Sequence, residues 1–263
     1  SKKLDTQGVS IGSYAMHLDD AKGTWTLSSP LNLPNGYLHI DRGSFDTHGQ
    51  DMHIRRFYSS NSNKRSITLG DSSIALKQFW FMANTKNLSF DAGTSQVVWN
   101  ANNTYRFEGG AASFHLLKVS VGSGKASVIG NTTFGEVHKS GPGELQLQGK
   151  FVVKGSVHHT SGVLSMTDSN AMGTLRLYSG VVLQLPSAKV QTLGHLTGKF
   201  SGATITIRAS QPGKQATLKQ VKGKVCLKNA HIKDIAATGG ATFSAESSVN
   251  AGNNSGWTFG ACK

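Results

Sequence analysis

The sequence has few acidic residues, few prolines and no long apolar segment. Only 14 of its 263 residues are Asp or Glu, against 27 Lys and Arg, so the formal net charge of +13 comes more from missing acids than from added bases. Proline accounts for 5 residues, whereas glycine accounts for 31. Because no apolar run approaches about 18 residues, no membrane-spanning helix is predicted. The composition also excludes a collagen and a coiled coil.

Cysteine is scarce as well, with Cys226 and Cys262 as its two copies. Neither belongs to a Cys-x-x-Cys motif, and a structural zinc site needs more Cys or His ligands than accompany this pair. We expect a disulfide that closes a loop of about 36 residues and tethers the end of the chain. The alternative is two unrelated thiols. A disulfide predicts an oxidising location such as the periplasm, the cell surface or the medium.

Short runs in which apolar and polar residues alternate recur along the chain, and helical periodicity is nearly absent. Period-two alternation indicates strands with one buried face, and the intervening Gly, Asn, Ser and Asp residues are typical of turns. A sandwich, a barrel or a β-solenoid could produce this pattern. The evenness of the strands, the brief connections and the recurring Gly–polar–apolar–polar–apolar phrase favour the solenoid. We expect a single all-β domain over residues 1–263, with N-terminal and C-terminal caps at 1–22 and 226–263.

Two phrases near the ends of the chain resemble those of a known family. The first phrase comprises Gly23–Leu27 (GTWTL), Gly43–Gln50, Phe57–Ser60 and Arg65–Ile74, and the second runs from Ala237–Phe243 to Gly252–Phe259. Their order is similar to that of a domain found in large secreted surface proteins of Bacteroidetes, including gliding-motility and adhesin-like proteins. The resemblance covers residues 23 to 259. It implies a right-handed parallel β-helix, export and surface display, and it implies no catalytic residue. The basic net charge of this chain differs from the usual pattern of such proteins, which are often acidic or near neutral.

The closing phrase also has a physical interpretation. Gly239-Gly240 and Gly252-Asn253-Asn254 favour positive φ angles, as tight turns require. Trp257 and Phe259 are two residues apart, so they face the same side of a strand and are placed to cover the last coil.

Catalytic patterns are weak in this sequence. Glycoside hydrolysis needs two carboxylates a few ångströms apart, but turn roles are expected for Asp46, Asp71 and Asp91. A polysaccharide lyase that uses calcium needs clustered oxygen ligands, which an acid-poor chain supplies poorly. The neighbouring residues His158 and His159 point to opposite faces of a strand, so solvated imidazoles are expected and no metal or cofactor is predicted.

Basic residues give a stronger indication of a ligand. Between residues 139 and 233 the acids are Glu144 and Asp168, whereas lysines are frequent. On a solenoid, residues at equivalent positions of successive coils form a stripe, and a basic stripe attracts polyanions such as acidic polysaccharides. The candidate binding residues are Arg208, Lys214, Lys219, Lys222, Lys224 and Lys228. Nucleic acid is a weaker candidate because no known motif for it is present. The alternative is that the lysines are dispersed and hinder the pairing of exposed strand edges with other chains.

Aromatic residues between 80 and 107 suggest a second surface. Trp80 and Trp99 are the candidate rings for stacking on sugars, and Phe79-Trp80-Phe81 cannot all point inward from a straight strand. Core packing is the alternative for these rings. Together these features predict a non-catalytic surface adhesin or structural module that binds an acidic or neutral glycan as part of a larger surface protein. A polysaccharide-degrading enzyme and a passive stalk are the other possibilities.

Overall fold

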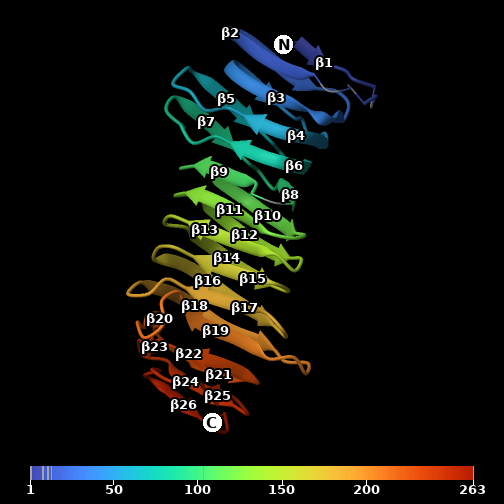
Figure 1. The fold of residues 1–263 in the computed structure, drawn as a ribbon. Helices are drawn as coiled ribbons and strands as arrows, with labels where there is room; N and C mark the ends of the chain where they lie inside the picture. The colour runs from blue at the N-terminus through green and yellow to red at the C-terminus, as the bar shows by residue number, and fades with distance from the viewer. Residues whose placement is uncertain (1, 8, 11, 13, 103, 263) are drawn as a thin grey trace.

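Parallel strands wound into successive coils make up the whole structure, which is a computed structural model. It describes residues 2–7, 9–10, 12, 14–102 and 104–262, and these residues form 26 strands and no helix. Figure 1 shows the strands stacked along one long axis, with the N-terminus at one end and the C-terminus at the other. The parallel β-solenoid expected from the sequence is therefore confirmed, with about 12 turns.

The strands are short in most coils and longer near the N-terminus. Their bounds are β1 (Lys2–Leu4), β2 (Ala15–Leu27), β3 (Leu31–Asp46), β4 (Met52–Tyr58), β5 (Arg65–Thr68), β6 (Ser73–Phe81), β7 (Leu88–Asp91), β8 (Gln96–Ala101), β9 (Arg106–Gly110), β10 (Ser113–Val121), β11 (Lys125–Gly130), β12 (Thr133–Ser140), β13 (Glu144–Gln148), β14 (Val152–His159), β15 (Val163–Met166), β16 (Asn170–Tyr178), β17 (Val182–Leu185), β18 (Val190–Lys199), β19 (Ile205–Ala209), β20 (Ala216–Gln220), β21 (Lys224–Lys228), β22 (Ala230–Lys233), β23 (Ile235–Thr238), β24 (Thr242–Glu246), β25 (Val249–Asn250) and β26 (Trp257–Phe259).

Each strand pairs in parallel with the equivalent strand of the next coil. Two series of pairings run along most of the molecule. The first stack joins β2, β3, β4, β6, β9, β11, β13, β15, β17, β19, β22 and β25. The second stack joins β8, β10, β12, β14, β16, β18, β20 and β23. A side chain on one coil therefore lies directly beside its register partner on the next, which is how residues distant in sequence form columns.

The core is a continuous column of inward-facing side chains along the axis. Every second residue of a strand enters it, as the alternating burial of β13 illustrates. Aromatic rings stack within the column: the ring centroids of Phe57 and Trp80 lie 4.0 Å apart, and those of Trp80 and Phe107 lie 5.6 Å apart. Burying one large apolar side chain contributes roughly 1.5–3 kcal/mol, so this column is the main source of stability.

Strand pairing begins earlier than the expected N-terminal cap would allow. Residues 15–22 belong to β2, and residues 15–19 already pair with β3, starting at Ala15 and Tyr37. β1 lies beyond them, with Lys2 in register with Trp25 of β2. Residues 1, 8, 11 and 13 of the expected cap, and residue 263 at the other end, lie outside the described residues.

The predicted disulfide between Cys226 and Cys262 is present, with the two Cα atoms 5.6 Å apart. Cys226 lies in β21, which pairs with β24, and β24 in turn pairs with β26. Trp257 and Phe259 of β26 are half-buried and pack against the end of the core from the same strand face, as their spacing predicts.

The turn at Gly239 and Gly240, which belongs to the closing phrase of the sequence, requires glycine at both positions. Gly239 has a φ of 101°, and a Cβ atom there would lie 2.1 Å from the carbonyl oxygen of Gln220 on the previous coil. A Cβ atom on Gly240 would lie 2.3 Å from the carbonyl oxygen of Val221. The predicted positive φ is therefore confirmed at Gly239, while Gly240 is needed for the close approach of two backbones.

Candidate functional site

Trp80 and Trp99, the two rings expected to stack on sugars, are completely buried. Trp80 lies between Phe57 and Phe107 in the core, and the Trp99 indole nitrogen donates to the backbone carbonyl of Gln78 at 2.9 Å. A ring without exposed surface cannot stack on a ligand, so the stacking role predicted for these two residues is wrong. Both occupy inward positions of their strands, and the outward positions beside Trp80 belong to Phe79 and Phe81.

Phe79 and Phe81 belong to an aromatic surface on the outer side of the first stack. Register places Phe79 beside Arg56, and Arg56 beside Tyr37. In the neighbouring column, Phe81 lies beside Tyr58. We call this set the aromatic–arginine surface, and it comprises Tyr37, Arg56, Tyr58, Phe79, Phe81, Tyr105 and Arg106. All its members are half-buried apart from the exposed Arg106.

Contacts between the rings hold the surface in place. The Phe79 and Tyr105 centroids lie 5.3 Å apart at an interplanar angle of 76°, and the Tyr58 and Phe81 centroids lie 6.1 Å apart. These edge-to-face and tilted arrangements are favourable for aromatic pairs. Side chains that are locked against one another present a preformed surface, and a preformed surface loses less entropy when a ligand binds.

Arg56 lies between two of these rings. Its guanidinium carbon is 4.8 Å from the Tyr37 centroid and 5.2 Å from the Phe79 centroid, so it makes a cation–π contact with each. Its Nε donates to the side-chain oxygen of Gln78 at 2.7 Å, and the Gln78 amide donates to the Tyr105 hydroxyl at 3.1 Å. Among the described residues Arg56 has no ion-pair partner, so its charge is not neutralised by a neighbouring carboxylate.

The surface contains one shallow pocket of about 150 Å³, lined by Tyr58, Phe79, Phe81 and Arg106. Arg106 forms an ion pair with Glu108, with 3.3 Å between Nε and Oε1. The pocket is smaller than the roughly 300–1,000 Å³ of typical small-molecule sites, so it suits part of an extended ligand lying across the surface.

The predicted basic residues are all exposed but do not form one stripe. Arg208 of β19 is in register with Lys233 of the next coil. Lys219 lies on the second stack, beside Thr192 and Thr238. The others lie elsewhere: Lys214 and Lys222 are in turns, and Lys224 and Lys228 are at opposite ends of β21, where Lys228 pairs with Glu246 at 3.3 Å.

A different row of basic residue types does lie in register, on the second stack. It comprises Lys118, His138, His158 and Arg176 from four successive coils. This row cannot be recognised in the sequence, because each member lies one coil away from the next and the coils differ in length. Groups hydrogen-bonded between neighbouring coils are 19 residues apart in one case and 25 in another.

His158 and His159 point to opposite faces, as predicted, but only His158 reaches the surface. His159 is completely buried, so the expected solvation of this imidazole is wrong. Its Nε2 atom lies 3.0 Å from the carbonyl oxygen of Val182. Burial disfavours the charged form and lowers the pKa of His159 to about 4, and the nearby charge of Lys139 acts in the same direction.

The turn roles expected for the acids are confirmed. Asp46 accepts a hydrogen bond from the backbone nitrogen of His48 at 2.7 Å, and Asp91 accepts one from Gly93 at 2.9 Å. Asp71 also lies in a turn. Carboxylates used in this way stabilise the loops between strands.

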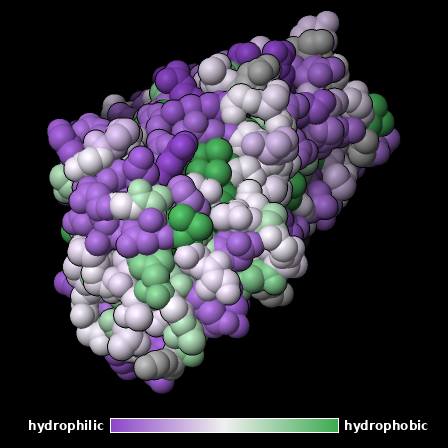
Figure 2. All heavy atoms as spheres, turned by 60° about the horizontal axis from the view of Figure 1, so that its bottom comes forward, coloured by the Kyte–Doolittle hydropathy of each residue, from purple (hydrophilic) through white to green (hydrophobic). Residues whose placement is uncertain are grey.

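One face of the exterior combines hydrophilic and neutral side chains (Figure 2). Figure 2 shows a face on which hydrophobic side chains form separate spots among hydrophilic and neutral ones. The strongly exposed hydrophobic residues are scattered along the chain: Val9, Tyr14, Val152, Val190, Val221 and Val249. Within the described part of the chain, no helix has the length and hydropathy that crossing a bilayer would require. No family model matches the chain, and no curated protein or solved structure matches it either.

Proposed function

We propose that the protein is a non-catalytic glycan-binding module and that the aromatic–arginine surface is its binding site. The observation that carries this proposal is the position of Arg56, between the rings of Tyr37 and Phe79. Aromatic rings pack on the apolar faces of sugars, and a guanidinium matches a carboxylate or sulfate group in two parallel hydrogen bonds. A surface that offers both groups side by side suits an acidic polysaccharide.

The charges around the surface support an acidic rather than a neutral ligand. Arg55 directly precedes Arg56 on β4, and Lys77 lies two residues before Phe79 on β6. Glu108 is the acid that is in register with Phe81, and Arg106 pairs with it. A locally positive surface on a chain of net charge +13 raises the concentration of polyanions near it.

Display on a bacterial surface is part of the proposal. The Cys226–Cys262 disulfide supports an oxidising location. The resemblance of residues 23–259 to domains of secreted Bacteroidetes surface proteins supports a role in adhesion within a larger protein. The shallow, open form of the pocket near Phe81 suits binding better than the enclosure of a reacting bond.

The test is a glycan array followed by calorimetry with the acidic oligosaccharides that bind. We expect Arg56→Gln to weaken binding about tenfold or more, because a charge-assisted hydrogen bond is lost. Phe79→Ala should weaken it by about fivefold to tenfold through the loss of stacking. Added salt should weaken binding by the wild-type protein.

Arg176→Gln is the matched control, because Arg176 is an exposed arginine on the other stack. It should leave affinity unchanged. The absence of glycan binding would overturn the proposal, as would binding that Arg56→Gln and Phe79→Ala leave intact. Release of shortened or unsaturated sugars during the assay would instead identify an enzyme.

A further inference from the structure

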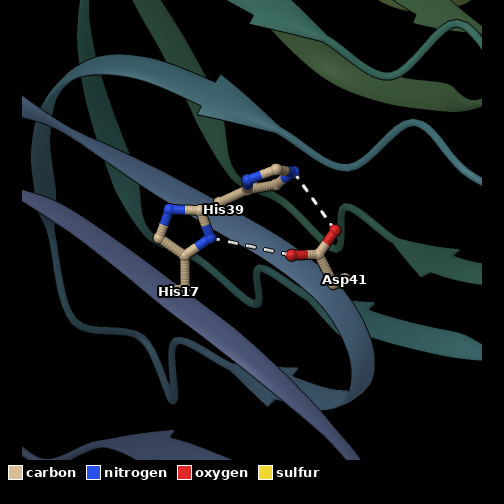
Figure 3. Close-up of side chains that lie close together, drawn as sticks. All are labelled: His17, His39 and Asp41. Atoms are coloured by element: carbon tan, nitrogen blue, oxygen red, sulfur yellow. Dashed lines mark ion pairs between the residues drawn. The ribbon is translucent and has the colours of Figure 1, made fainter.

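Two histidines and an aspartate come together at the N-terminal end of the first stack. His17 of β2 and His39 of β3 are register partners on neighbouring coils, with ring centroids 4.8 Å apart. Asp41 follows His39 by two residues and therefore projects from the same side of the strand. Figure 3 shows the carboxylate of Asp41 lying beside both imidazoles.

Three potential ligand atoms of these residues lie close to one another. His17 Nδ1 lies 3.7 Å from one carboxylate oxygen of Asp41, and His39 Nε2 lies 3.3 Å from the other. All three ligand atoms lie within 4.8 Å of one another. A tetrahedral ion with bonds of about 2.0–2.2 Å needs its ligand atoms about 3.3 Å apart. Zinc binding therefore requires the His17 side chain, which is 56% exposed, to move toward the other two ligands.

We propose that His17, His39 and Asp41 bind a zinc ion and leave one coordination position open. Imidazole nitrogens with a carboxylate suit zinc and related first-row transition metals, whereas calcium and magnesium prefer ligand sets made of oxygen. Three protein ligands leave the fourth tetrahedral position to water or to an exogenous group.

Outer contacts orient the carboxylate, as they commonly do around metal sites. The Asn61 side-chain amide donates to Asp41 Oδ1 at 3.4 Å, and the Asn63 amide donates to the Asp41 backbone carbonyl at 3.2 Å. Arg65, which is 2% exposed, donates to backbone or side-chain oxygens of both asparagines and fixes their loop. The loop between β4 and β5 therefore positions a ligand that belongs to β3.

A second group with similar ligands is a poorer zinc site. Glu136, His138 and His158 also approach one another, with 2.9 Å between His138 Nε2 and Glu136 Oε2. However, Lys118 is in register with His138 on one side, and Arg176 is in register with His158 on the other. These cations repel a divalent ion. The sulfurs of Cys226 and Cys262 are joined in a disulfide and offer no thiolate.

The test is calorimetric titration of the full chain with Zn²⁺ in a buffer that does not chelate metal. We expect one high-affinity equivalent for the wild-type protein and a zinc-dependent rise in melting temperature. His17→Gln and Asp41→Asn should each weaken binding at least about tenfold. Asn61→Ala should weaken it by about tenfold, as expected for a residue that orients a ligand. Both His17→Gln and Asp41→Asn keep side chains of similar size at surface positions, so folding can be verified by circular dichroism.

His138→Gln is the matched control, because it removes an imidazole from the other group of the same type. It should leave the zinc equivalent intact. X-ray absorption of the zinc-loaded protein should show two imidazole ligands. The proposal is overturned if zinc does not bind saturably, or if His138→Gln removes the site while His17→Gln does not.

Discussion

Lys139 and His159 occupy the same position of two neighbouring coils, and both side chains lie inside the solenoid. The Lys139 amine donates to the backbone carbonyl oxygens of Ser140, Gly141 and Ser161 at 2.7–2.9 Å. Burial of this amine lowers the pKa of Lys139 to about 8. Two titratable groups therefore stand in a core that is otherwise mainly apolar, and each makes folding depend on pH.

His159 should make the protein less stable in mild acid. Its pKa is about 4 in the folded protein and returns to the ordinary value near 6.5 on unfolding. Between these pH values the unfolded chain binds a proton that the folded chain does not, so the free energy of unfolding falls as the pH falls from about 6.5 to about 4. The expected loss is about 3 kcal/mol.

Urea denaturation at a series of pH values measures this effect. His159→Gln should lack the acid-dependent component, and His115→Gln, which changes an exposed imidazole of β10, should retain it. Parallel stability curves for the wild-type protein and His159→Gln would contradict the prediction.

Lys139 should make the protein more stable in mild alkali. Its folded pKa of about 8 lies below the ordinary value near 10.5, so between these values the unfolded chain holds the extra proton. The free energy of unfolding should therefore rise by about 3 kcal/mol from pH 8 to pH 10.5, because the folded state no longer contains a buried charge. Lys139→Met should abolish the rise. Lys154→Met removes an exposed lysine of β14 and should preserve it, so an equal effect of both variants would count against this account.

Period-two alternation predicted the strands, and the evenness of the strands and the brief connections favoured a solenoid, but neither feature shows which face of a strand is buried. The alternation placed Phe79 and Phe81 opposite Trp80, and the assignment of inside and outside came only with the structure. An inward-facing lysine such as Lys139 could not be predicted, because the alternation assigns apolar residues to the inner face and polar residues to the outer face. The disulfide was predictable because two cysteines allow a single pairing.

The columns on the surface could not be predicted, since they depend on the length of every coil between their members. His17 and His39 meet because one particular coil has the required length, and Arg56 reaches Phe79 only across a register shift in the pairing of β4 with β6. Bulges of this kind are set by local backbone conformation and leave little trace in a composition or a period.

Removing the disulfide should destabilise the C-terminal coils. Closure of a loop of 36 residues contributes about 3–4 kcal/mol in the chain-entropy model. A variant with both Cys226→Ser and Cys262→Ser should lose about this much stability. Because each coil contacts mainly its neighbours, hydrogen exchange should increase in β21, β24 and β26 before it increases elsewhere. Reductant should destabilise the wild-type protein and leave the double variant unchanged; a wild-type protein indifferent to reductant would refute the prediction.

Trp80 and Trp99 provide a matched pair for measuring how much one buried hydrogen bond contributes to the free energy of unfolding. Both indoles are fully buried, but the Trp99 nitrogen donates to Gln78, whereas the Trp80 nitrogen has no hydrogen-bond partner among the described residues. Replacement by Phe costs packing at both positions. At Trp99 it also removes a hydrogen bond, while at Trp80 it removes a buried donor that is left unsatisfied. Trp99→Phe should therefore destabilise the protein by at least about 1 kcal/mol more than Trp80→Phe, as measured by urea denaturation. Equal losses would mean that the Trp80 nitrogen reaches a partner, such as a buried water, in solution.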